Sequence, residues 1–311
     1  MKRIHFNEVV TRDGFQMEPA FIATGDKVAL VDALSECGFA KIEVTSFTSP
    51  KAIPMLRDAE EVMGRIRRAP GVEYTVLVPN MRGAERALES RADELNLVMS
   101  TSETHNLANL RMTREKSFGA LADVIRMVDG RTPVNVSLST CFGCPMEGEV
   151  PQAEVMRWAW RFADLGARGL TLCDTTGMAH PAQVTRIAEA LQQHFPQQQL
   201  TLHFHNTRGM GLANLLAAVQ SGIVRFDGSL GGLGGCPYAP GASGNICSED
   251  AIHMLDAMGY DTGIDLSKLL AVARRLPHIV GHEVPGQLAK AGRIGDLHPA
   301  PESVRMLKET A

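Results

Sequence analysis

The chain has 311 residues, of which 44% are hydrophobic and 21% charged, and its formal net charge is −4 at pH 7. This composition suits one large folded unit, and a slightly acidic chain without a Lys/Arg-rich run is not expected to bind nucleic acid or an anionic membrane. No apolar run approaches the ~20 residues of a membrane span, and the N-terminus shows no signal peptide. We therefore expect a cytoplasmic protein whose six cysteines are reduced.

Strand-like and helical segments alternate along the chain. The strand-like segments cover residues 4–11, 41–46, 73–78, 94–99, 134–139, 170–173, 200–206 and 225–229. The helical segments that follow the first seven strands cover residues 26–36, 57–68, 82–90, 103–129, 151–165, 181–194 and 210–220. Eight strand-and-helix units predict an α/β fold of the TIM type, a (β/α)₈ barrel, and a doubly wound sheet is the runner-up.

Several polar residues favour the barrel because they lie at or near the C-terminal ends of the predicted strands. They are Asp13, Glu43, Asn80, Asp174, His203 and His205. In a barrel those ends gather at one mouth, where the active site lies, whereas in an open sheet they would be spread along an edge. The chain lacks a Gly-x-Gly-x-x-Gly motif after the first strand and a phosphate-binding loop ending in Lys-Ser/Thr, which disfavours dinucleotides and nucleoside triphosphates.

The strand at residues 200–206 carries the pair His203 and His205. Side chains two apart on a strand point to the same face, so two imidazoles about 7 Å apart can converge on one metal ion. The alternative is a pair of histidines on a solvated sheet edge. The pair Cys141 and Cys144 has the spacing of a zinc ribbon but no second pair, and is expected to serve packing or loop structure.

A glycine-rich segment at residues 231–245 follows the eighth strand and contains Cys236 and Asn245. Glycine permits close backbone approach, which suits a lid over a site, although a plain flexible loop has the same composition. Two more helices are predicted at 248–258 and 267–275. We expect residues 1–290 to form the catalytic barrel with its C-terminal helices, and residues 291–311 to form a loosely packed tail.

One carboxylate, two imidazoles and one amide can meet if the barrel closes as predicted. These candidate ligands are Asp13, His203, His205 and Asn245. A mixed nitrogen and oxygen set without thiolates suits a divalent ion such as Mg²⁺ or Mn²⁺, with positions open for a substrate.

Three motifs resemble the 3-hydroxy-3-methylglutaryl-CoA lyase family, a branch of the metallolyase TIM barrels that also include isopropylmalate and homocitrate synthases. Residues 11–16 read Thr-Arg-Asp-Gly-Phe-Gln, similar to the Arg-Asp-Gly-x-Gln motif of the whole superfamily. Residues 43–50 resemble the lyase branch, and residues 231–245 resemble the lyase signature loop nearly residue for residue. The resemblance extends from about residue 5 to residue 290.

The resemblance implies that the four candidate ligands hold the metal and that Arg12 and Cys236 are catalytic, with Glu43 and Asp174 in supporting roles. It implies retro-Claisen cleavage of 3-hydroxy-3-methylglutaryl-CoA, or a close 3-hydroxy-3-alkyl acyl-CoA, to acetyl-CoA and acetoacetate or the matching 3-oxo acid. Arg12 would stabilise the enolate, and Glu43 would orient Arg12 through a bidentate pair. Cys236, or water near it, would protonate the product. Asp13 or a metal-bound group would be the base. We also expect a homo-oligomer, a dimer or a tetramer.

The sequence departs from the lyase pattern at two places. Thr11 stands where lyases usually have Pro, and residues 206–210 read Asn-Thr-Arg-Gly-Met where lyases usually read Asp-Thr-Tyr-Gly-Gln. The sequence His-x-His-Asn is closer to the synthases. A condensing synthase that joins acetyl-CoA to a 2-oxo acid, and a non-catalytic metal-binding barrel, are therefore the alternative functions.

Overall fold

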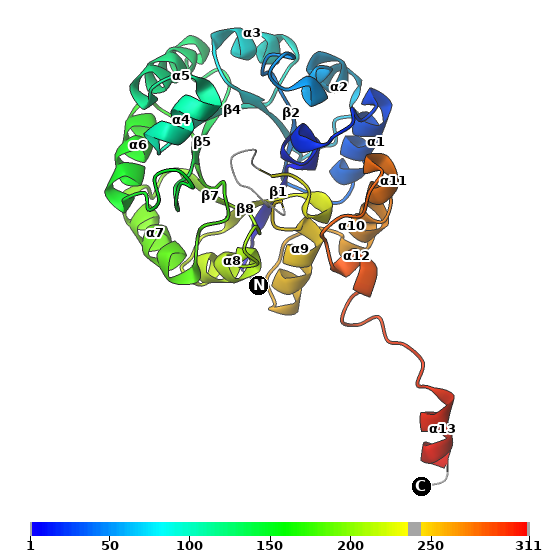
Figure 1. Ribbon diagram of the computed structural model, residues 1–311. Coiled ribbons are helices and arrows are strands. Elements are labelled where there is room, and N and C mark those ends of the chain that lie inside the picture. Colours follow the sequence, from blue (N-terminus) through cyan, green and yellow to red (C-terminus); the bar gives the residue numbers. More distant parts are fainter. Residues whose placement is uncertain (1, 236–243, 310–311) are drawn as a thin grey trace.

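The computed structural model describes residues 2–235 and 244–309, in which eight parallel strands form a closed barrel (Figure 1). Each strand pairs with the next, and β8 pairs with β1 to close the ring. The strands are β1 His5–Glu8, β2 Lys41–Ser46, β3 Glu73–Val78, β4 Glu94–Ser100, β5 Val134–Ser139, β6 Gly169–Asp174, β7 Gln199–Phe204 and β8 Arg225–Gly228. The predicted (β/α)₈ barrel is confirmed.

A ring of helices covers the outside of the barrel (Figure 1). These helices are α1 Thr24–Ser35, α2 Ala59–Arg65, α3 Met81–Glu89, α4 Glu103–Leu110, α5 Arg114–Val128, α6 Gln152–Asp164, α7 Pro181–His194, α8 Gly211–Gln220 and α9 Ser248–Ala257. The short helices α10 Leu266–Ala273, α11 Leu276–Val280 and α12 Leu288–Ala291 follow α9, and α10 contacts both α9 and α1. No helix in the described part of the chain is long and apolar enough to cross a membrane.

The strands alternate between an aliphatic face and a polar face, and both are buried. In β5, Val134, Val136 and Leu138 belong to the same hydrophobic core as helix residues such as Trp158 of α6. The residue between the first two, Asn135, instead lines the interior of the barrel. The main core therefore lies between strands and helices, while the lumen of the barrel is lined with polar side chains.

The first strand is shorter than the predicted segment 4–11. It ends at Glu8, and the chain coils into a π-helix, η1 Val10–Gly14, in which the backbone N–H of Gly14 donates to the carbonyl of Val9 over 3.3 Å. The Glu8 carboxylate accepts the N–H of Val10 over 2.9 Å, which takes that donor away from strand pairing. Single π-helical turns are frequent at functional sites, and this one turns residues 12 and 13 over the end of the barrel.

The predicted helix at residues 103–129 is two helices. Arg111 ends α4 in the left-handed conformation with φ of 56°, and Thr113 begins α5 by accepting the N–H of Lys116 with its hydroxyl. The Asn106 side chain donates to the carbonyl of Met112 over 2.8 Å and holds the break. The predicted helix at 57–68 is also shorter, since a 3₁₀ turn at Pro54–Leu56 precedes α2 and the chain is extended at residue 66.

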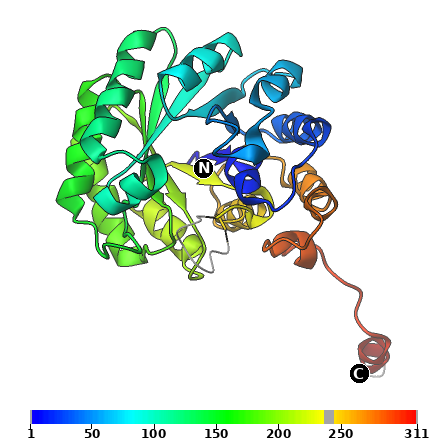
Figure 2. The ribbon, with the colours of Figure 1, turned by 45° about the horizontal axis from the view of Figure 1, so that its top comes forward.

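The last helix, α13 Glu302–Glu309, lies apart from the barrel in two views of the molecule (Figure 1, Figure 2). The side chains of Ile294 and Leu297, in the segment that leads to it, are exposed. The predicted tail from residue 291 thus contains a helix that the sequence analysis did not anticipate.

Candidate metal centre

The four predicted metal ligands lie at the mouth of the barrel, at or beyond the C-terminal ends of strands. Asp13 lies in the π-helix η1 after β1, and His203 and His205 lie at the end of β7. Asn245 reaches them because its backbone forms an isolated antiparallel bridge with His205. The structure therefore brings together residues that are up to 232 positions apart in the chain.

The side chains of Asp13, His203 and His205 converge with one potential ligand atom each, all within 4.8 Å of one another. The Nε2 atoms of the two histidines are 3.1 Å apart. The Asp13 Oδ2 atom lies 3.9 Å from Nε2 of His203 and 3.6 Å from Nε2 of His205. All three residues are buried, so a charge placed among them is shielded from bulk water.

The arrangement fits a divalent cation on two observations. The Asn245 amide donates from Nδ2 to Asp13 Oδ2 over 2.7 Å and to the carbonyl of Leu233 over 2.9 Å, while its buried Oδ1 has no hydrogen-bond partner among the described residues. A buried oxygen without a partner is costly unless a ligand takes it. In addition, the Nε2 atoms of the two imidazoles face each other at 3.1 Å, so both can ligate one cation placed between them.

The Arg12 guanidinium lies between two carboxylates. Its Nε donates to Glu43 Oε2 and its Nη1 to Asp13 Oδ1, and Gln16 Nε2 donates to the same Asp13 oxygen over 2.8 Å. The other oxygen of Glu43 accepts from Asn96 Nδ2 over 2.6 Å. Glu43 therefore contacts Arg12 through one oxygen and not through the predicted bidentate pair, since Asn96 occupies the second oxygen.

The surroundings of Asp13, His203 and His205 shift the pKa of each side chain in a way that its burial and charged neighbours explain. Burial alone would raise the pKa of Asp13, but Arg12 and the two imidazoles hold that pKa well below its usual range. Burial also lowers the pKa of His205, which is the net direction for that ring. For His203 the carboxylates of Asp227 and Asp13 outweigh burial and raise the pKa. Asp13 is thus a carboxylate at neutral pH, as a metal ligand must be.

The remaining predicted residues are Asp174 and Cys236. Asp174 lies at the C-terminal end of β6, and its Oδ1 accepts the N–H groups of Met178 and Ala179 over 2.7 and 3.1 Å. Burial raises its pKa to about 6, and its buried Oδ2 has no hydrogen-bond partner within residues 2–235 and 244–309. Asp174 therefore stabilises the loop after β6 with one carboxylate oxygen and leaves the other oxygen available to a ligand. Cys236 and most of the predicted lid lie outside the described residues.

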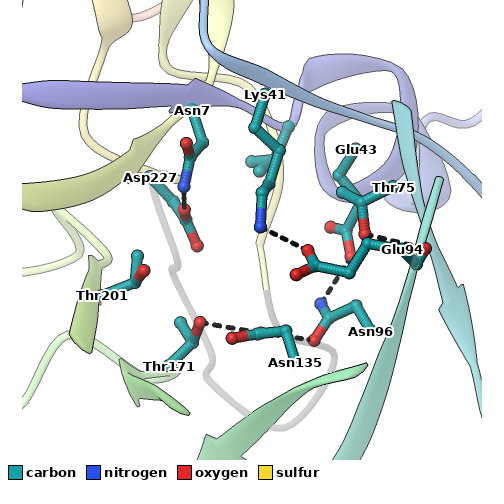
Figure 3. Close-up of a pocket in the computed structure, with 11 residues that line it drawn as sticks. Asn7, Lys41, Glu43, Thr75, Glu94, Asn96, Asn135, Thr171, Thr201 and Asp227 are labelled. Atoms are coloured by element: carbon teal, nitrogen blue, oxygen red, sulfur yellow. Dashed lines mark hydrogen bonds and ion pairs between the residues drawn. The ribbon is translucent and has the colours of Figure 1, made fainter. Parts of the chain in front are cut away.

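A polar network inside the barrel, which was not predicted from the sequence, supports the centre (Figure 3). Asp227 of β8 contacts Nδ1 of His203 over 3.3 Å, and Asn135 holds the Asn96 that contacts Glu43. The network surrounds a cavity of about 20 Å³, which has room for little more than one water molecule, so a substrate must bind above it at the mouth. The sequence pattern that could have revealed this network is the occurrence of polar residues at alternate positions of aliphatic strands, such as Glu94 and Asn96.

Comparison with known proteins places these features in one family. Residues 3–276 match the family model described as HMGL-like. A hydroxymethylglutaryl-CoA lyase from Bacillus subtilis is 46% identical over 287 residues, which cover 92% of this chain and 96% of the relative. The human mitochondrial hydroxymethylglutaryl-CoA lyase is 37% identical over 291 residues, with 93% and 90% covered.

A solved structure of an HMG-CoA lyase from Acinetobacter baumannii, in complex with coenzyme A and 3-methylmalate, is 52% identical to this chain. It superposes with a TM-score of 0.93 and covers 96% of this chain and 98% of its own. The similarity therefore extends over the whole barrel and the C-terminal helices.

Proposed function

The chain belongs to the HMGL-like family, and we propose that it is a metal-dependent carbon–carbon lyase that cleaves 3-hydroxy-3-methylglutaryl-CoA to acetyl-CoA and acetoacetate. One observation carries the proposal: Asp13, His203 and His205 converge at the barrel mouth next to the guanidinium of Arg12. The relative solved with coenzyme A and 3-methylmalate supports a CoA thioester as the substrate. Close 3-hydroxy-3-alkyl acyl-CoA thioesters are the neighbouring substrates to test.

Asp13, His203 and His205 would hold the metal, with Oδ1 of Asn245 as the fourth protein ligand. Two imidazoles, a carboxylate and an amide oxygen suit Mg²⁺ or Mn²⁺. When bound, the cation supplies Lewis acidity to a hydroxyl and a carboxylate of the substrate. The sequence departures at Thr11 and at residues 206–210 leave this ligand set intact.

In the cleavage, a base takes the proton of the tertiary hydroxyl, the hydroxyl oxygen becomes the carbonyl oxygen of acetoacetate, and the electron pair of the broken C2–C3 bond forms a thioester enolate. Arg12 is placed to stabilise the negative charge that develops on the thioester oxygen. Its Nε–H is committed to Glu43, which fixes the plane of the guanidinium. Asp13 is a poor candidate for the base because both of its oxygens already accept hydrogen bonds, from Arg12, Gln16 and Asn245.

The enolate carbon must gain a proton to leave as acetyl-CoA, and we assign that step to Cys236 or water beside it on the basis of the signature loop. Asp174 would support the site through its Oδ2, which no residue in the described part of the chain contacts by a hydrogen bond. Excluding water around the enolate is the role proposed for the lid formed by residues 231–245.

The test is a screen of acyl-CoA thioesters with Mg²⁺ or Mn²⁺, in which acetyl-CoA and the 3-oxo acid are both quantified. We expect turnover of 3-hydroxy-3-methylglutaryl-CoA, its loss after chelation and its return when metal is added. Incubation of acetyl-CoA with 2-oxo acids, read out as free CoA, tests the condensing synthase in parallel. Full lyase turnover by a metal-free preparation would contradict the proposed role of the centre.

We further propose that the protein acts in the cytoplasm as a homo-oligomer, a dimer or a tetramer, with residues 1–290 as the catalytic unit. All five cysteines in the described residues are free thiols, as is usual in a reducing compartment. Fractionation of cells tests the compartment, and analytical ultracentrifugation tests the assembly.

A further inference from the structure

Three neighbouring strands carry a line of polar contacts that ends on one metal ligand. Asn7 of β1 and Asp227 of β8 are register partners, and Asn7 Nδ2 donates to Asp227 Oδ1 over 2.8 Å (Figure 3). Asp227 and His203 of β7 are also register partners, and Asp227 Oδ2 lies 3.3 Å from His203 Nδ1. Asp227 thus uses one oxygen for each neighbour, and this geometry is set by the closure of the barrel.

The two histidines of the centre are held differently. His203 presents Nδ1 to Asp227 on one side and Nε2 toward Asp13 on the other. The buried Nδ1 of His205 has no hydrogen-bond partner in the described part of the chain. Among the described residues, a carboxylate therefore faces the Nδ1 atom of only one of the two imidazoles, although the Nε2 atoms of both lie near Asp13.

We propose that Asp227 is a positioning residue for the metal centre, with Asn7 orienting its carboxylate. An acceptor on Nδ1 keeps the proton of neutral His203 on that nitrogen, so the Nε2 lone pair is presented to the cation. The carboxylate also makes the imidazole a stronger donor to the metal. This inference rests on the proposed metal-dependent function, and it assigns a role to a residue outside the predicted ligand set.

A purely structural role for Asp227 is the competing explanation, because Asp227 also lines the polar cavity inside the barrel. The two explanations differ in what they say about metal affinity. If Asp227 only fills the cavity, its replacement alters stability but leaves the affinity for metal unchanged. If Asp227 positions His203, metal affinity falls even in a variant that folds normally.

The experiment measures Mn²⁺ binding to the full-length protein by electron paramagnetic resonance titration, without substrate. Asp227→Ala removes the acceptor, whereas Asp227→Asn keeps an oxygen of the same shape without the charge. Thr201→Val is the matched control, since Thr201 lines the same cavity two residues before His203 on β7 and is not one of the candidate ligands. Melting temperatures of the metal-free proteins verify that each variant is folded.

We expect Asp227→Ala to weaken Mn²⁺ binding about 10- to 100-fold, Asp227→Asn to weaken it less, and Thr201→Val to bind like the wild type. Histidine ¹⁵N spectra of the metal-free wild type should show one ring protonated on Nδ1, and this signal should be lost in Asp227→Ala. Should Asp227→Ala not fold, Asp227→Asn alone decides the question. Wild-type Mn²⁺ affinity in a folded Asp227 variant overturns the positioning role and leaves the lyase proposal standing, whereas a wild-type protein that binds no Mn²⁺ overturns both.

Discussion

Replacing Arg12 should lower kcat far more than it raises KM. A guanidinium carries five N–H donors, and within the described residues Arg12 commits Nε–H to Glu43 and one Nη1–H to Asp13. The side chain is 11% exposed, so its remaining donors can reach a substrate at the mouth. Loss of one donor to a developing oxyanion costs roughly 10²–10³-fold in kcat, about 2.7–4 kcal/mol. The loss of kcat in Arg12→Lys should lie in this range, because one ammonium group cannot reproduce the planar fork of donors of a guanidinium.

The assay is steady-state cleavage of 3-hydroxy-3-methylglutaryl-CoA with saturating Mn²⁺, and bound Mn²⁺ is quantified in the same preparations. Quantifying the metal separates loss of catalysis from loss of metal, since Arg12 also contacts the ligand Asp13. Arg161→Lys is the control, because Arg161 pairs with Glu115 between outer helices. A kcat near that of the wild type with a raised KM in Arg12→Lys would show that the guanidinium only binds substrate.

Three further changes test other parts of the site. A Cβ at Gly234 would come within 2.5 Å of Nδ2 of Asn245, so Gly234→Ala should weaken Mn²⁺ binding. Gly209→Ala should not, because Gly209 also has a positive φ but a Cβ there would meet no described atom within 4 Å. Burial raises the pKa of Glu8 to about 8 from 4.5, so its contribution to stability is present below pH 4.5 and is lost as pH rises through about 8. Urea denaturation at a series of pH values should show that the free energy of unfolding falls less with pH in Glu8→Gln than in the wild type. The same dependence on pH in both proteins would contradict this prediction. A thiol reagent should inactivate the enzyme at Cys236, acyl-CoA plus metal should slow that reaction, and peptide mapping that locates the label on another cysteine would refute the assignment.

The barrel could be predicted from the sequence because the pattern of each strand-and-helix unit is local and occurs eight times. Each unit combines an aliphatic strand with a helix, and the right number of units closes the sheet. The predicted ligands Asp13 and His203 could be found because strand ends meet at one mouth whatever the details of packing. The predictions were wrong where a single side chain altered the backbone. The carboxylate of Glu8 takes the N–H of Val10 and ends β1 early, and the amide of Asn106 stabilises the break between α4 and α5.

The support beneath the metal centre could not be predicted in the same way, because it depends on register between strands that are distant in the chain. Asn7 and Asp227 are 220 positions apart and meet only after β8 pairs with β1. A one-residue slip of that pairing would turn the Asn7 side chain away from Asp227, and a slip between β7 and β8 would turn Asp227 away from His203. The metal centre is therefore sensitive to the last step of barrel closure, and metal affinity reports on whether β1 and β8 are correctly paired. A folding intermediate with β1–β7 in place but without β8 would contain Asp13 and both histidines but would lack Asp227 in its native position, so it should bind metal more weakly than the closed barrel.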